Sequence, residues 1–304
     1  MAGPIRPSEL KNKELRSDMH RKLKKQKQKT KTERRKQLAR EEKKDPSLKE
    51  KRLKENVPKT LENTREKDET MADPAEVDDE VEQDKAMDEL ASYFSGTKPK
   101  LVITSSKRMS AEGYDFCAEL LSLFPDAQFA KREKHHQLKD VIEQSIKHEF
   151  TDLMIVNEDK KQPNAITLMH LPNGPSAYFK LSNFVSAKKM PGHGAITAHN
   201  PEIILNNFNT RLGHTIGRMF QALYPHTPEF EGRQVVTFHN QRDFIFVRRH
   251  RYVFRDTEKV GLQELGPKFT LKLRWLQKGL YDRDGEYEWI FKPEMETSRK
   301  RFFL

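Results

Sequence analysis

Apolar residues recur at helical spacing in two parts of this chain, and each series follows a short apolar run. The runs are KLVIT at 100–104 and EIIL at 202–205. The first helical series is Gly113, Phe116, Cys117, Leu120, Leu121 and Phe124. The second helical series is Leu212, Ile216, Met219, Phe220 and Leu223. In both places the pattern predicts a strand followed by an amphipathic helix that packs on a sheet.

The signals for the ends of these two helices also agree. Ser110 and Thr210 precede the apolar series and are predicted to cap the helices, and Pro125 and Pro225 end them. Cys117 lies on the apolar face of the first helix, with no candidate base beside it in the sequence. We therefore expect a small buried hydrophobe rather than a catalytic thiol.

Further strand-like runs follow each helix in the same order. They are DLMIV at 152–156 and AITLMHL at 165–171 in the first series, and QVVTFH at 234–239 and DFIFVRRHRYVF at 243–254 in the second. Each series ends in a Gly-Pro stretch, GPSAYFKL at 174–181 and GPKFTLKL at 266–273. We predict an α/β fold of two duplicated halves, about 98–187 and 200–290, packed with pseudo-twofold symmetry and joined by a linker at 188–201.

The first 92 residues differ from the rest in charge. Residues 1–60 contain 22 Lys and Arg against 9 Asp and Glu, whereas residues 61–92 contain 3 against 13. The leucines of this extension are too widely spaced to build a core, so it is predicted to be disordered when alone or to form a long solvated helix. The basic run at 22–37 fits an RNA-binding helix, a nuclear import signal or a solubilising tail.

The acidic block ends in MDELASYF, at 87–94, which places Met87, Leu90 and Phe94 on one helical face. We expect it to dock on the folded part or on a partner. At the other end of the chain, residues 291–304 are predicted to be a basic tail.

The composition of the whole chain limits its partners and its compartment. The net charge of +11 and the pI of about 9.4 favour polyanions such as nucleic acid. No apolar run approaches a membrane span, and no signal peptide is expected. The single cysteine excludes an intramolecular disulfide and a Cys-rich zinc site. We expect a soluble intracellular protein with no membrane partner.

Several segments resemble the Brix domain family over roughly residues 98–290. They are TSSKR after the first strand, the LFP helix end, LSN at 181–183 and the late GPKFTLKL stretch, with HNQRDFIFVRRHRYVF and GEYEWIFKPEMETSRKRFFL towards the end. The resemblance implies two halves that are each like an anticodon-binding domain. It also implies a non-catalytic assembly factor of the nucleus and nucleolus. Such a factor binds precursor ribosomal RNA of the large subunit and a dedicated protein partner in the pre-60S particle.

The resemblance also implies an RNA-binding segment around 257–274, where the residues themselves alternate. Phe269, Leu271 and Leu273 would face one side of a strand, and the polar residues would face the other. Cations spaced in this way can follow phosphates, although an ordinary strand with a solvated face has the same pattern. The candidates in and just after this segment are Lys259, Lys268, Thr270, Lys272, Arg274 and Lys278.

Two further basic groups are candidates for RNA contact. Arginines with Tyr252 and Phe254 beside them suit stacking on unpaired bases, and equally suit a core. These arginines are Arg248, Arg249 and Arg251. Lys107 and Arg108 lie in the loop after the first strand, where binding residues often gather. The weaker candidates are Lys131, Arg132 and Lys134.

Signatures of catalysis are missing from the sequence, and we expect no enzyme, no cofactor and no small-molecule substrate. His135-His136 and the trio of His193, His199 and His214 lack the spacing of a metal site. PGHG at 191–194 is not a phosphate loop. The acidic set formed by Asp282, Asp284 and Glu286 has the composition of a turn.

One alternative class of function remains. The chain would then be mainly a protein-binding scaffold in pre-ribosomal particles, with only nonspecific RNA affinity from its charged ends.

Overall fold

The computed structural model describes residues 11–61, 63–66, 70–71, 90–94, 96–133, 135–256, 259–298 and 300–304. The chain divides into two compact units, Met1–Thr64 and Arg65–Leu304. Of the helices in the described ranges, none has both the length and the apolar character that crossing a bilayer requires.

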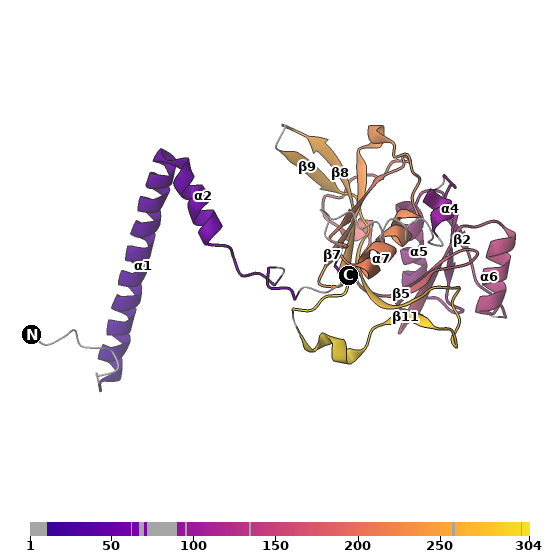
Figure 1. The fold of residues 1–304 in the computed structure, drawn as a ribbon, viewed down its shortest axis with the longest axis horizontal. Coiled ribbons are helices and arrows are strands. Elements are labelled where there is room, and N and C mark those ends of the chain that lie inside the picture. Colours follow the sequence, from indigo (N-terminus) through magenta and orange to yellow (C-terminus); the bar gives the residue numbers. More distant parts are fainter. Residues whose placement is uncertain are drawn as a thin grey trace, which may run out of the picture. The chain divides into compact units, whose positions relative to one another are not determined.

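The first unit is helical and has no core in its described part. It contains α1 (Lys13–Lys44) and α2 (Pro46–Glu55) (Figure 1). None of the described side chains of either helix is buried. The side chain of Asn12 caps α1 by accepting from the N–H of Glu14 at 2.9 Å. The two described helices of the predicted extension thus have no buried residues, and the basic run at 22–37 lies within α1.

The second unit is built on one mixed sheet, in which eleven strands are described. The first strands are β1 (Leu101–Ser105), β2 (Gln128–Ala130), β3 (Asp152–Asp159), β4 (Gln162–His170) and β5 (Ser176–Val185). The later ones are β6 (Glu202–Asn206), β7 (Gln234–Gln241), β8 (Phe244–Phe254), β9 (Val260–Glu264), β10 (Lys268–Gln277) and β11 (Tyr287–Ile290). The helices of this unit are α4 (Ala91–Phe94), α5 (Ala111–Leu123), α6 (Leu138–Lys147) and α7 (Arg211–Gln221).

Apart from β2 at one edge, the strand order reads in the same way from either side of the sheet centre. It runs β2-β1-β3-β4-β5-β10-β8-β7-β6, with β9 added to β8 and β11 added to β10. β1 is parallel to β3, as β6 is parallel to β7, and the pairs that follow inwards are antiparallel on both sides. This order agrees with the repeat that the sequence predicts, whereas the duplication itself and the pseudo-twofold axis stay predictions.

The two Gly-Pro stretches are neighbours at the centre of this order. β5 and β10 run antiparallel, with Leu181 opposite Leu271 and Phe179 opposite Leu273. Both Gly-Pro bonds are cis. The similar octapeptides thus form the seam between the two halves.

The main core lies on the face of the sheet that carries α5 and α7. Helix α5 of the first half reaches β10 of the second through Phe116 and Phe269, whose ring centroids are 5.5 Å apart. Helix α7 of the second half reaches β5 of the first through Phe220 and Phe179, at 5.3 Å. Because each helix packs on a strand of the other half, the halves share one core.

Helix α6 covers a smaller core on the opposite face. Val102, Leu153 and Ile155 point to it, and they alternate with residues of the main core along β1 and β3. Ile142 of α6 packs among them. The sequence analysis did not predict α6, although Leu138, Val141, Ile142 and Ile146 have helical spacing.

Both predicted helix starts are correct, because Ser110 and Thr210 are the N-cap residues of α5 and α7, but only one of the two side chains forms a capping bond. Thr210 caps α7 by accepting from the N–H of Gly213 at 2.9 Å. The hydroxyl of Ser110 instead donates to the main-chain oxygen of Lys161 at 3.1 Å, so its side chain does not cap α5. This bond links the residue before α5 to the turn between β3 and β4.

The segment predicted to dock does dock on the folded part. Leu90 and Tyr93 are buried, and the Tyr93 hydroxyl donates to the main-chain oxygen of Tyr224 at 2.5 Å. Phe94 is 39% exposed, so the buried face differs from the predicted one. Met87 lies outside the described residues.

Candidate nucleic-acid interface

Strand β10 has the alternation that its sequence predicts. Phe269, Leu271 and Leu273 are buried in the main core. On the other face Lys268, Lys272 and Arg274 are partly exposed. Thr270, a candidate for RNA contact, is only 4% exposed and thus offers little surface to a ligand.

The polar face of β10 is covered in part by the C-terminal segment. Lys272 forms an ion pair with Glu296 and lies 4.7 Å from the ring centroid of Phe291. The guanidinium of Arg274 lies 4.5 Å from the same ring. These two cations are therefore engaged by the chain itself. Residues 291–304 were expected to be a basic tail, and their last residue, Leu304, is only 1% exposed and lies in the main core.

The arginines of β8 have three different environments. Arg248 pairs with Glu264 at 2.9 Å in a partly exposed position. Arg251 donates to the main-chain oxygen of Ala195 at 3.0 Å. Arg249 is 2% exposed, and its guanidinium is bonded to Gln234 and to the main-chain oxygen of Ser122. The interpretation of Arg249 as an RNA contact is corrected, because the side chain is a buried structural link.

The exposed candidates are distributed over several loops. Lys107 and Arg108 are exposed after β1, Lys259 is exposed before β9, and Lys278 is exposed after β10. Among the weaker candidates, Lys131 lies 5.7 Å from the ring centroid of Tyr114. Lys134 lies outside the described residues.

One hollow on the α6 side of the sheet brings basic and aromatic residues together. It has a volume of about 730 Å³. The cations in its lining are Lys107, Arg132, Lys139 and Arg283. The aromatic residues in its lining are Tyr178, Trp275 and Tyr281. A groove with cations and open aromatic faces has the composition that single-stranded nucleic acid favours.

Several residues of this hollow were missed by the sequence analysis. Tyr178 and Trp275 lie far apart in the sequence, and only the strand register brings them together. Tyr281 is separated from Trp275 by a bend after β10. Asp282 and Asp284 also line the hollow, in the turn that their composition predicts. The main-chain oxygen of Asp282 accepts from the amide of Gln277 at 2.8 Å, which holds this turn against β10.

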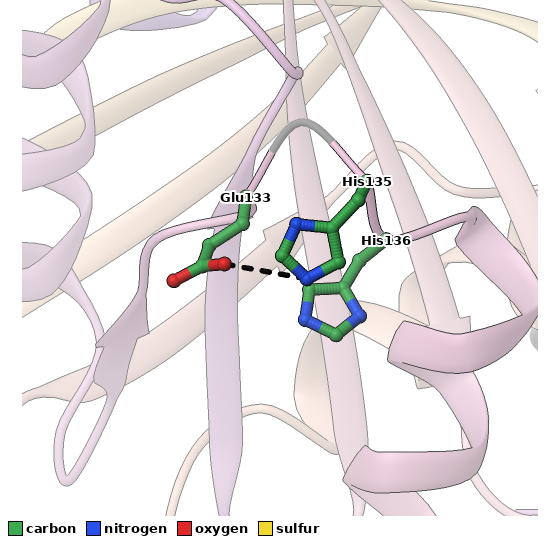
Figure 2. A group of neighbouring side chains, drawn as sticks. All are labelled: Glu133, His135 and His136. Atoms are coloured by element: carbon green, nitrogen blue, oxygen red, sulfur yellow. Dashed lines mark ion pairs between the residues drawn. The ribbon is translucent and has the colours of Figure 1, made fainter.

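The loop between β2 and α6 borders the hollow and carries a group of three possible metal ligands. Figure 2 shows Glu133, His135 and His136, with the carboxylate of Glu133 3.4 Å from Nε2 of His135. Their ligand atoms lie within 4.8 Å of one another, and the Glu133 and His135 side chains are 66% and 71% exposed. This arrangement is that of a surface ion pair between neighbours in sequence. The loop also positions Arg132, whose Nε donates to the main-chain oxygen of His136 at 3.1 Å.

The family model of the Brix domain matches residues 106–275, from the residue after β1 to near the end of β10. "Ribosome production factor 1" of Saccharomyces cerevisiae is 49% identical over 96% of this chain and 97% of that protein. The protein of the same name in Pongo abelii is 52% identical over 98% of this chain and 84% of that protein. A solved structure of a probable ribosomal biogenesis protein from Aeropyrum pernix K1 covers 57% of this chain and 96% of that one, with 13% identity and a TM-score of 0.42. The match to the family model and the near full-length identity show that this chain belongs to the Brix domain family.

Proposed function

We propose that this chain is a non-catalytic RNA-binding assembly factor of the large ribosomal subunit, which acts on precursor ribosomal RNA in the nucleolus. The observation that carries the proposal is the identity of about half the residues, over nearly the whole chain, with proteins called ribosome production factor 1. A dedicated protein partner within the pre-60S particle is part of the proposal.

Two features of the chain support RNA as the ligand. The first unit is a solvated helical segment, rich in lysine and arginine, of the kind that neutralises phosphates without reading sequence. The second unit carries exposed cations in loops and the basic, aromatic hollow beside α6. Such a pair of surfaces combines nonspecific affinity with a place for unpaired bases.

The alternative is a protein-binding scaffold, and the β8–β9 hairpin favours it. Phe254 and Leu262 are 70% and 63% exposed on this hairpin, which extends from the body of the unit (Figure 1). Exposed apolar side chains that lie close together often mark protein contacts. The two functions are compatible in one particle, but they differ in what holds the factor there.

The test is crosslinking in cells, with sequencing of the attached RNA and mapping of the crosslinked peptides. We expect crosslinks between large-subunit precursor RNA and the second unit. Crosslinks confined to residues 1–60 and scattered over many RNAs would contradict the proposal and favour the scaffold.

A matched pair of variants sharpens this test in vitro. Arg108, Lys259 and Lys278 are exposed in the second unit, and their joint replacement by Gln should weaken binding to precursor RNA and reduce its salt dependence. The control is the replacement by Gln of three exposed lysines of α2, which are Lys49, Lys51 and Lys54. Equal losses in both variants would mean that charge alone, and no site on the second unit, holds the RNA.

A further inference from the structure

A row of side chains crosses the sheet beneath the hollow. The strand register sets Ile155 opposite Thr167, Thr167 opposite Tyr178, and Tyr178 opposite Trp275. Residues directly opposite on neighbouring strands point to the same face and lie about 5 Å apart. The row therefore places a short threonine between Ile155, which packs in the core under α6, and the first aromatic ring.

The aromatic end of this row is stacked. The rings of Tyr178 and Trp275 lie 5.6 Å apart with an angle of 7° between their planes. Trp275 also stacks with Tyr281, at 5.2 Å and 20°. In the described part of the chain, Trp275 is the one aromatic ring that contacts Tyr178. Because Thr167 is short, the hollow extends beside Tyr178 on the threonine side, and both residues line it.

The charges at the hollow favour an anionic ligand. Its cations come from four places: Lys107 from the loop after β1, Arg132 from the loop before α6, Lys139 from the first turn of α6, and Arg283 from the turn after β10. Against these four stand two carboxylates, both in the turn after β10. The excess of cations thus lies at the α6 side, away from that turn.

We propose that this hollow binds an unpaired nucleotide of RNA, with its base against the Tyr178–Trp275 stack and its phosphates at Lys107, Arg132 and Lys139. This inference rests on RNA being a ligand of the chain. A flat base can stack on an aromatic face at van der Waals distance, and Tyr178 and Trp275 both line the hollow. Paired bases are excluded, since the faces of bases in an A-form duplex are stacked on their neighbours and are not open to an aromatic ring of the sheet. The volume of about 730 Å³ suits a ligand of this size.

The chain offers an internal reporter for this site. It contains two tryptophans, Trp275 in the hollow and Trp289 on β11. Trp289 packs against Phe291 and Phe303, at 6.4 and 5.9 Å, and is not in the lining of the hollow. The full chain with Trp289→Phe thus reports on the hollow alone, and the full chain with Trp275→Phe is the matched control.

The experiment titrates both variants with a mixed-sequence single-stranded RNA of 12 nucleotides and with a blunt duplex of the same sequence. We expect the single strand to quench the fluorescence of Trp275 and to leave that of Trp289 unchanged. Adding Tyr178→Leu to the Trp289→Phe chain should weaken the fluorescence-detected binding by about tenfold. Adding Lys107→Gln and Arg132→Gln instead, at positions that do not enter the main core, should weaken it and lower the salt slope by about two.

Three outcomes would overturn the inference, and they separate it from the proposed function. In the first outcome, fluorescence anisotropy shows that RNA binds the chain, but the fluorescence of Trp275 does not change and all variants bind equally. The hollow is then not the RNA-binding site, while the proposal that the chain binds RNA is unaffected. If neither RNA binds at all, the inference and the proposed function both fail. If the duplex or a poly-glutamate peptide quenches Trp275 as strongly as the single strand, the hollow selects charge rather than an unpaired base.

Discussion

Arg249 on β8 donates to the side-chain oxygen of Gln234 on β7 from two nitrogens, at 3.0 and 2.6 Å. Its remaining terminal nitrogen donates to the main-chain oxygen of Ser122, near the end of α5. Arg249 and Gln234 are both buried. This buried network ties two strands of the second half to a helix of the first.

Arg249→Leu should lower the free energy of unfolding by about 3 kcal/mol, because it removes the arginine donor from the buried side-chain oxygen of Gln234 and from the partly buried main-chain oxygen of Ser122. Urea denaturation of the full chain measures the change. The matched control is Arg248→Leu, which removes a partly exposed ion pair with Glu264 and should cost less than about 1 kcal/mol. Equal costs for the two substitutions would show that the network does not stabilise the fold.

Gly174 precedes β5 with a φ of +108°, and a Cβ atom there would lie 2.3 Å from the main-chain oxygen of Lys278. Gly96 has the same φ, but a Cβ atom there would meet nothing within 4 Å. Gly174→Ala should therefore destabilise the protein by more than Gly96→Ala, which carries only the backbone cost of about 1–2 kcal/mol. Thermal unfolding of the two variants compares them directly. Similar unfolding temperatures would mean that the chain after β10 moves aside without cost.

The carboxylate of Asp243 accepts from the main-chain N–H groups of Phe303 and Leu304, at 2.8 and 2.9 Å. Burial raises the pKa of Asp243, and the bonds to these two N–H groups act in the opposite direction. A raised folded-state pKa means that the contribution of this group to stability is present at low pH and is lost as the pH rises through that pKa.

Asp243→Asn should therefore be tolerated at neutral pH, because the amide keeps an acceptor oxygen without a buried charge, and asparagine accepts the positive φ of 62° at this position. Asp243→Ala should destabilise by about 1–3 kcal/mol and increase hydrogen exchange at Phe303 and Leu304. Exchange that is equally fast in both variants would contradict the role of the acceptor oxygen.

Cys117 is 2% exposed on α5, and burial raises its pKa to about 12. The folded protein thus favours the neutral thiol over the thiolate. The contribution of this preference to the free energy of unfolding is complete below the usual thiol pKa, and it is lost as the pH rises towards 12. The stability difference between the natural chain and Cys117→Ala should be largest near pH 8 and should shrink above pH 9, as measured by urea denaturation. A difference that is constant with pH would show that the thiolate is not disfavoured in the fold.

Periodicity was enough to predict the elements that carry the main core. The two helices, with Phe116 and Phe220 on their inner faces, and the strands on which they pack lie where the apolar spacing predicts them. The alternation along β10 was also predicted correctly for Phe269 and Leu271. These features depend on local spacing, which the sequence carries directly.

The candidate site could not be predicted in the same way. Arg249 and Arg251 look alike in sequence, and Gln234 lies opposite Arg251 in the register, yet it is Arg249 that bonds to Gln234 and is buried. Tyr178 and Trp275 are brought together by a register that joins distant segments and shifts between Leu273 and Trp275. If side chains are assigned to alternate faces from Lys268 onwards, Trp275 is placed on the wrong face, because the register shift before it reverses the alternation.

The seam between β5 and β10 also sets the order of events during synthesis. Opposed residues such as Leu181 and Leu271 are 90 positions apart, so β5 leaves the ribosome well before its partner does. At about 5–20 residues per second, this delay lasts roughly 5 to 20 seconds. During that time the nascent first half presents an open strand edge and the uncovered rings of Phe116 and Phe179. Until β10 covers it, the edge of β5 can pair with the same edge of a second nascent copy.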